Sequence, residues 1–340
     1  MGVRTSLLSA TFVGQDLDKA LPLLVDSIVR PNLDAQDFEP ARSLALQELQ
    51  ALADDPEERA GVEAMARHHP EPFNRSSYGS VQGLQACTHA DAVAFHRARY
   101  VPGGSVIALA GDVDPARARR VLEDAFQGWS GRAEAPAPSG PARRGTTHLV
   151  DDSAQVQVVV VREAPPDGGP SAACERLACA ILSGGMSGRL FTEVREKRGL
   201  CYAVHAAYTP ESPTGWLTAY VGTTPERAGT SLEVLLAELD RLATPDGAPT
   251  AEELERARVG LKSRLVFGGE STAARAGALA NDYRRLGRCR SLEDRLAEVD
   301  AVTLEGLRGH LNGFADRPQT VLTLGPASES LSSEPSACTP

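Results

Sequence analysis

Two side chains with complementary chemistry, Arg195 and Tyr202, lie seven residues apart in the sequence. An arginine offers forked N–H donors to a peptide carbonyl, and a tyrosine hydroxyl can hydrogen-bond an oxygen on which negative charge develops. Such a pair on its own is usually an exposed helix residue and a half-buried strand residue. Here, however, it comes after the glycine pair Gly184-Gly185 and an amphipathic turn-to-helix segment. A generic globular linker does not need these features in this order, so the stretch 183–202, with its REKRGLCY ending, is the strongest candidate for a functional site.

The seven histidines and the clustered glycines do not add a second recognisable site. A catalytic metal needs converging ligands, and a phosphate-binding loop needs glycines at fixed spacings between a strand and a helix. His89 and His96 are two helical turns apart without an acid on the same stripe. The other histidines stand alone or in a loop rich in prolines. The segment before the glycines is expected to be a helix, so ordinary packing and turn roles explain both groups better.

Strands and amphipathic helices must position these candidates, and they alternate without a strict strand–helix–strand rhythm. This pattern predicts an α+β fold with mostly antiparallel sheets backed by helices. In the first half the expected strands are 7–14 and 105–111, and the expected helices are 17–29, 38–53 and one from Thr88 to Tyr100. In the second half the strands are 147–150, 156–162, 216–222 and 320–325, and the helices are 172–182, 232–242, 251–267 and one that starts at Thr303.

Composition divides the chain into two domains. Residues 130–145 are rich in proline, alanine, glycine and serine, which predicts a linker, and residues 327–340 are expected to be a disordered tail. The domains are then 1–129 and 146–326. The two repeat the same order of elements: Gly14 corresponds to Gly222, Thr88 to Thr303 and Gly111 to Gly325, at nearly constant spacing.

The repeat also indicates that the first domain is incomplete at its N-terminal end. The second domain has about 70 residues ahead of its strand at 216–222, whereas the first has about six ahead of its strand at 7–14. Roughly sixty residues that the repeat predicts are therefore absent from the sequence.

Composition excludes several classes of function. The chain has 340 residues, a net charge of −10 and no basic cluster, which argues against a nucleic-acid or anionic-membrane surface. No apolar run approaches the roughly 20 residues of a membrane span. The six cysteines form no CxxC pair, and we interpret them as unpaired residues in a reducing, cytoplasmic compartment.

The stretch 183–202 closely resembles the signature in the C-terminal half of the insulinase and pitrilysin family of zinc peptidases, which includes the mitochondrial processing peptidases. The resemblance extends over about residues 5–326. It implies two homologous α+β domains around a peptide-sized chamber, with Arg195 and Tyr202 binding the substrate backbone. The family carries its zinc on a His-x-x-Glu-His helix in the first domain, and these 340 residues contain no such motif.

One metal ligand is carried over by the resemblance. Glu48 matches the distal glutamate that completes the family's zinc site, and its counterpart in the second repeat is Arg264. The family places another acid two turns earlier, where this chain has Ala41. A catalytic zinc needs three protein ligands and an open position, so Glu48 alone does not make a site. We therefore expect no complete catalytic site and no zinc bound by this chain alone.

Three hypotheses about function remain open. In the first, the chain is part of a zinc metalloendopeptidase whose zinc helix lies on a missing N-terminal segment, with Glu48 as third ligand. In the second, it is a non-catalytic subunit that binds the peptide or protein substrate and pairs with a homologous zinc-bearing subunit. In the third, it is a degenerate scaffold that binds peptides or proteins.

Overall fold

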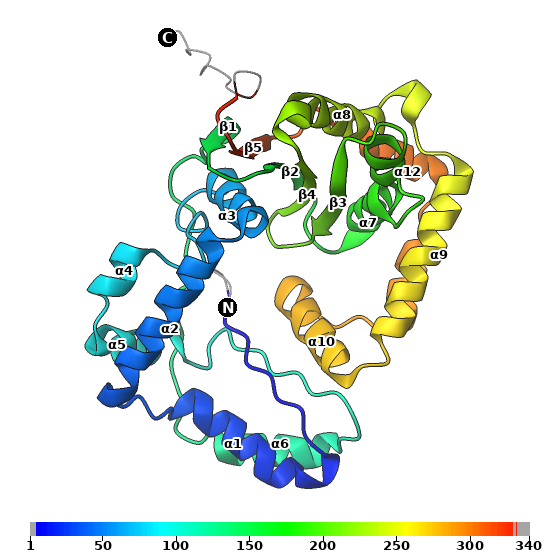
Figure 1. The fold of residues 1–340 in the computed structure, drawn as a ribbon. Helices are drawn as coiled ribbons and strands as arrows, with labels where there is room; N and C mark the ends of the chain where they lie inside the picture. Colours follow the sequence, from blue (N-terminus) through cyan, green and yellow to red (C-terminus); the bar gives the residue numbers. More distant parts are fainter. Residues whose placement is uncertain (1–4, 329–330, 332–340) are drawn as a thin grey trace. The chain divides into compact units, whose positions relative to one another are not determined.

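A computed structural model describes residues 5–328 and Leu331 (Figure 1). The chain forms two compact units, each built from several segments. Of the described residues, the first contains 5–54, 75–138 and 268–289, and the second contains 55–74, 139–267, 290–328 and Leu331. Helices dominate, and one five-stranded sheet lies in the second unit, so the expected α+β class is confirmed. In the described part of the chain, no helix has the length and hydropathy needed to cross a membrane.

The sheet of the second unit has the order β1-β5-β2-β4-β3. Its strands are β1 (Gly145–Val150), β2 (Val156–Ala164), β3 (Cys201–Thr209), β4 (Gly215–Thr223) and β5 (Gln319–Gly325). Within this sheet only the β1–β5 pair is parallel, as expected for a mostly antiparallel sheet. β2 is central and buried on both faces, which explains its unbroken run of valines from Val158 to Val161.

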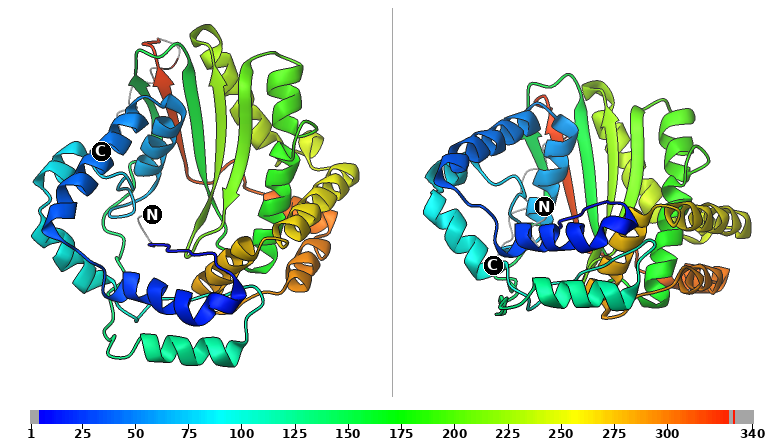
Figure 2. Two further views of the ribbon diagram at one scale, coloured as in Figure 1. Left: turned by 60° about the horizontal axis from the view of Figure 1, so that its bottom comes forward. Right: turned by 90° about the horizontal axis from the view of Figure 1, so that it is seen from below.

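Helices cover both faces of this sheet (Figure 2). The main core holds residues of α7 (Gly169–Ser183), α8 (Ala228–Arg241), α9 (Ala251–Gly268), α11 (Leu292–Asp300) and α12 (Leu304–Leu311). The opposite face is covered by α3 (Pro56–His68), whose Ala60 and Ala64 are fully buried against Val159, Val161 and Leu322. Small side chains on one stripe of α3 let the helix backbone approach the sheet closely.

The first unit is helical in its described residues. It contains α1 (Leu17–Val29), α2 (Ala35–Ala53), α4 (Val81–Ala86), α5 (His89–Arg99), α6 (Pro115–Ala125) and α10 (Thr272–Leu286). A small core joins Leu17 and Leu21 of α1 to Ala118 of α6. Arg117 donates to both carboxylate oxygens of Asp18 at 2.9 and 2.6 Å, which ties the same two helices together at the surface.

The internal repeat predicted from sequence is visible in matching contacts. Arg42 of α2 pairs with Glu39 and donates to the carbonyl of Cys87, just before Thr88 caps α5. Arg258 of α9 pairs with Glu255 and donates to the carbonyl of Val302, just before Thr303 caps α12. By the same spacing α3 corresponds to α10. The compact units therefore depart from sequence order, because α3 belongs to the second unit and α10 to the first.

The strands expected at 7–14 and 105–111 are wrong. Residues 5–13 and 105–110 have no regular hydrogen-bonded structure, and a short 3₁₀ turn (Gly14–Asp16) comes after the first segment. Their counterparts in the second unit are β4 and β5, which do not pair with each other, because both pair with β2. The described residues of the first unit contain no strand that could play the part of β2, so neither segment has a neighbour for its backbone.

Most of the tail expected at 327–340 lies outside the described residues. Leu331 is described, and it is buried in the main core of the second unit.

Candidate peptide-binding site

The signature stretch of the second unit runs from the end of α7 to the edge strand β3. A loop at 184–188 leads into a wide π-helical turn, η2 (Phe191–Glu196), in which the Lys197 amide donates to the Thr192 carbonyl at 2.9 Å. Such turns are rare and frequently occur at functional sites. Phe191 and Arg195 lie four residues apart on this turn, and η2 contacts β3 directly.

A tight turn at 197–200 joins η2 to β3, and hydrogen bonds to its backbone stabilise it. Gly199 adopts a left-handed conformation with φ +58°. Its amide donates to the carbonyl of Arg195, and the Leu200 amide donates to the carbonyl of Val194, both at 3.0 Å. Leu200 is buried in the core, and its carbonyl accepts a 2.6 Å hydrogen bond from Thr223 Oγ1 on β4. The Gly-Leu pair of the signature thus ends the helical turn and anchors the start of β3.

Tyr202 owes its exposure to a β-bulge. Cys201 lies opposite Thr223 and Ala203 lies opposite Gly222, so Tyr202 is an extra residue on β3 with no partner position on β4. Bulges at sheet edges re-aim a side chain and are common beside active sites. The Tyr202 side chain is 80% exposed, far more than the half-buried strand tyrosine that an ordinary strand position would give.

The structure brings Arg195 and Tyr202 together. The Arg195 guanidinium carbon lies 5.3 Å from the centre of the Tyr202 ring and 5.0 Å from the centre of the Phe191 ring. Both contacts are within cation–π range. In the described residues no carboxylate or carbonyl accepts a hydrogen bond from Arg195. Its neighbours differ: Arg189 pairs with Glu253, and Lys197 and Arg198 both pair with Glu193.

This arrangement fixes the position of a guanidinium while leaving its donors unused. Two rings hold it by their faces, and a peptide carbonyl or carboxylate placed beside it can take its N–H groups. The Tyr202 hydroxyl is exposed next to it and can donate to a second oxygen. The site can therefore bind a polar backbone and stabilise charge on it.

Two residues of this site, Phe191 and Glu193, are not among those predicted from the sequence. Both could have been found from helical spacing, since Phe191 precedes Arg195 by four residues and Glu193 precedes Lys197 by four. The bulge at Tyr202 has no comparable local signal.

Glu48, the candidate zinc ligand, lies on α2 in the first unit and is exposed. Among the residues described, no three histidine, cysteine, aspartate or glutamate side chains are grouped closely enough to hold a metal ion. The donor set around Glu48 therefore does not fit a zinc site.

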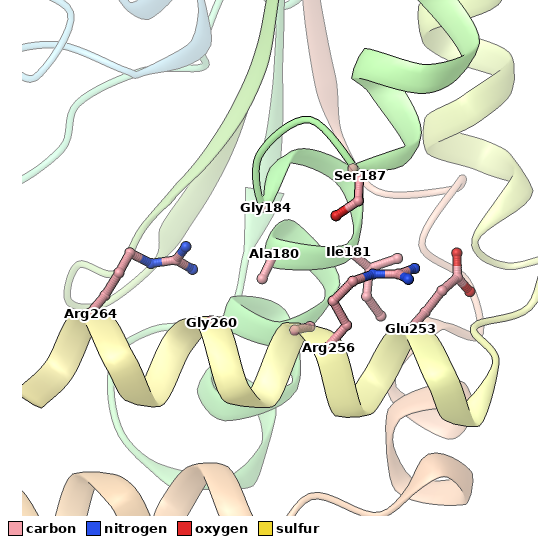
Figure 3. Close-up of a pocket in the computed structure, with 10 residues that line it drawn as sticks. Ala180, Ile181, Gly184, Ser187, Glu253, Arg256, Gly260 and Arg264 are labelled. Carbon is pink, nitrogen blue, oxygen red and sulfur yellow. The ribbon is translucent and has the colours of Figure 1, made fainter.

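The counterpart of Glu48 in the second repeat, Arg264, lines a small cavity beside the signature loop (Figure 3). The cavity lies between the end of α7, Gly184 and Ser187 of the loop, and α9, which also contributes Arg256. Its volume is about 20 Å³, enough for roughly one water molecule. It is too small for a peptide side chain.

Comparisons with known proteins agree on one family. Residues 86–261 match the family model described as the peptidase M16 inactive domain. An uncharacterized zinc protease of Mycobacterium tuberculosis is 30% identical over 327 residues, which cover 93% of this chain and 74% of the relative. An uncharacterized zinc protease of Streptomyces coelicolor is 28% identical, with 93% and 71% covered.

Solved structures show the same fold. The peptidase M16 inactive domain from Pseudomonas fluorescens has a TM-score of 0.78 at 26% identity, with 91% of this chain and 74% of that chain covered. A protease from Helicobacter pylori has a TM-score of 0.77 at 19% identity, with 92% and 77% covered. The latter likeness concerns the fold alone.

Proposed function

This chain belongs to the M16 peptidases, the insulinase and pitrilysin family that its signature resembles, and we propose that it is a substrate-holding member that binds extended peptides through Arg195 and Tyr202. The observation that carries the proposal is the state of Arg195. Its guanidinium is fixed against two aromatic rings, and its donors meet no acceptor among the described residues. An arginine held in this way is prepared for a ligand rather than for an internal ion pair.

The adjoining strand supports a peptide as the ligand. β3 is an edge strand of the sheet, since in the described structure it pairs only with β4. An extended peptide can add to such an edge by main-chain hydrogen bonds. Tyr202 projects from the bulge at the start of this edge, so a peptide lying along β3 passes the hydroxyl and the guanidinium together.

In this proposal hydrolysis is supplied elsewhere. The family uses zinc, but the residues described here form no zinc site, so we assign this chain the peptide-binding part and assign the zinc helix to a homologous partner subunit. The cytoplasmic location expected from the sequence belongs to the same proposal.

A second candidate function is zinc-dependent hydrolysis by a longer form of the protein, with Glu48 as third ligand. Its support is twofold. The relatives are named zinc proteases, and the match covers only 74% of the M. tuberculosis relative, which is therefore longer than the matched part. Adding a homologous His-x-x-Glu-His segment to the chain separates the two candidates. Chelator-sensitive cleavage that Glu48→Gln abolishes favours the longer enzyme, whereas binding without cleavage favours the substrate-holding role.

The binding proposal is tested by fluorescence anisotropy with a library of labelled, unstructured decapeptides. Charge-assisted hydrogen bonds contribute about 1.5–3 kcal/mol, so Arg195→Ala is expected to weaken binding by at least about tenfold. Tyr202→Phe removes a neutral hydrogen bond and is expected to cost about threefold. Arg256→Ala is the matched control, because Arg256 is an exposed arginine of the same unit that pairs with Glu252. Equal binding by the Arg195→Ala and Arg256→Ala variants would reject the proposal.

A further inference from the structure

A carboxylate inside the signature stretch, Glu193, binds two cations at once. It lies on η2 and is only 9% exposed. One of its oxygens binds Lys197 Nζ at 2.7 Å, and the other binds Arg198 Nη1 at 2.7 Å. Arg198 also donates to the backbone carbonyl of Glu193 itself at 2.7 Å. We propose that Glu193 is a positioning residue, which holds Arg195 against Tyr202 and keeps it the uncommitted cation of the segment.

The geometry of the turn supports this role. Lys197 and Arg198 form the start of the turn whose Gly199 amide closes onto the Arg195 carbonyl. Because Glu193 binds both cations, it fixes the last part of η2 and the first part of the turn to the same side chain. Arg195 lies between Glu193 and Lys197 in the chain, so the ion pair of these two residues restrains the backbone that carries Arg195. The backbone at Tyr202 is positioned separately, by the bulge on β3.

The charges around Glu193 support the same role. Hydrogen bonds from Lys197 and then from Arg198 lower the pKa of Glu193, so this carboxylate is ionised at neutral pH. Arg241 of α8 also lies near Glu193, with Nη1 at 4.0 Å from one carboxylate oxygen. The same nitrogen pairs with the buried Glu238 at 3.1 Å. With Glu193 ionised, Lys197 and Arg198 are both committed. Without that charge, Lys197 would lose its ion pair and Arg198 would keep only the Glu193 carbonyl, so both could compete with Arg195 for the same ligand oxygens.

The expected effect of Glu193 on peptide affinity rests on the proposed peptide-binding function, whereas its effect on the position of Arg195 does not. The experiment measures the position of Arg195 and the peptide affinity separately. Geometry is measured by NMR from the Arg195 Nε–Hε resonance, which should lie upfield because the Phe191 and Tyr202 rings face the guanidinium. Function is measured from the decapeptide affinity. Glu193→Gln removes the charge and nearly keeps the volume, and Glu193→Asp keeps the charge. Glu196→Gln is the matched control, since Glu196 is an exposed acid on the same turn.

We expect Glu193→Gln to abolish the ring-current shift of Arg195 and to weaken peptide binding by about tenfold, the scale of a small misplacement of a binding group. Glu193→Asp is expected to restore part of both, and Glu196→Gln to change neither. In the Arg195→Ala background, Glu193→Gln should cause no further loss of affinity, because it acts through Arg195.

Two results would overturn the proposal. The first is an unchanged Arg195 resonance in Glu193→Gln. The second is a loss of affinity in the Arg195→Ala background as large as in the parent chain, which would assign Glu193 a general structural role. If the parent chain binds no peptide while the Arg195 resonance still depends on Glu193, the positioning role stands and the peptide-binding function fails.

Discussion

At the scale of single residues, Gly199 allows the tight turn between η2, which carries Arg195, and β3, which carries Tyr202. Its φ of +58° lies in the left-handed region, which costs a residue with a side chain about 1–2 kcal/mol. A Cβ at this position would meet no atom within 4 Å, so the cost is conformational and not steric. Gly199→Ala should therefore lower the free energy of unfolding of the second unit by about 1 kcal/mol in a urea titration.

Gly309→Ala provides a control of opposite sign. Gly309 is exposed within α12 of the same unit, and a Cβ there would also meet nothing within 4 Å. Alanine favours a helix over glycine, so this variant should be more stable by up to about 1 kcal/mol. A Gly199→Ala variant that is as stable as the parent chain, or that gains stability as Gly309→Ala does, would contradict the assignment of Gly199 as a required left-handed turn residue.

Other features of individual residues differ in how well the sequence predicts them. The pairing of Arg195 with Tyr202 is predictable, because one turn and one short loop connect them. The exposure of Tyr202 is not, because the bulge depends on how β3 pairs with β4, more than a dozen residues away. Likewise, the sequence does not predict that the donors of Arg195 are unused. That conclusion requires the ion pairs of the neighbouring cations, which the structure supplies.

At the scale of elements, helices are predicted better than strands. α1 has the expected bounds, and α2 and α9 match the expected helices closely, because their apolar spacing is local. The segments at 7–14 and 105–111 have strand-like composition, yet they form no strands in the described structure. A strand depends on a neighbour that its own sequence does not specify. The assignment of α3 to the second unit is equally invisible in the sequence.

The C-terminal end of α3 carries a buried histidine that should make the docking of this helix pH-dependent. His68 is 1% exposed, and its Nδ1 lies 3.2 Å from Thr320 Oγ1 on β5. Burial lowers the pKa of His68 to about 3, with Arg144 and His69 adding to the effect. The folded state thus holds His68 neutral, while in the unfolded chain it titrates near 6.5. Stability is lost as pH falls below about 6.5, because only the unfolded chain gains the proton.

Between pH 7 and pH 5 this linkage should cost about 1–2 kcal/mol of unfolding free energy in the second unit, as measured by urea titration at each pH. His68→Gln should flatten the dependence, because glutamine does not titrate. His205→Gln is the control, since His205 is an exposed histidine of the same unit. A slope that persists in His68→Gln would show that other groups cause it.

At the scale of the whole molecule, one repeated sequence pattern occurs in two different environments. In the second unit, Thr320 and Val321 of β5 are 0% and 4% exposed, between β1 and β2. Their counterparts in the first unit, Val106 and Ile107, are 37% and 49% exposed in an irregular segment. The same type of sequence is thus a buried strand where a sheet surrounds it and an exposed chain where the described residues offer no sheet. The burial of these residues therefore depends on the surrounding sheet and not on the sequence of the segment itself.

This contrast predicts a large difference in hydrogen exchange within one molecule. Amides of β5 are held by ladders on both sides and should exchange only through large openings of the second unit. Amides at 105–110 have no ladder and should exchange faster by at least about a hundredfold, measured by mass spectrometry on peptic fragments covering 102–112 and 317–326. Helix α6, next in the chain, is the internal control, since its own hydrogen bonds should give intermediate protection. Protection at 105–110 equal to that of β5 would mean that these residues gain a hydrogen-bonded strand partner in solution, and the first unit would then be a sheet-containing domain like the second.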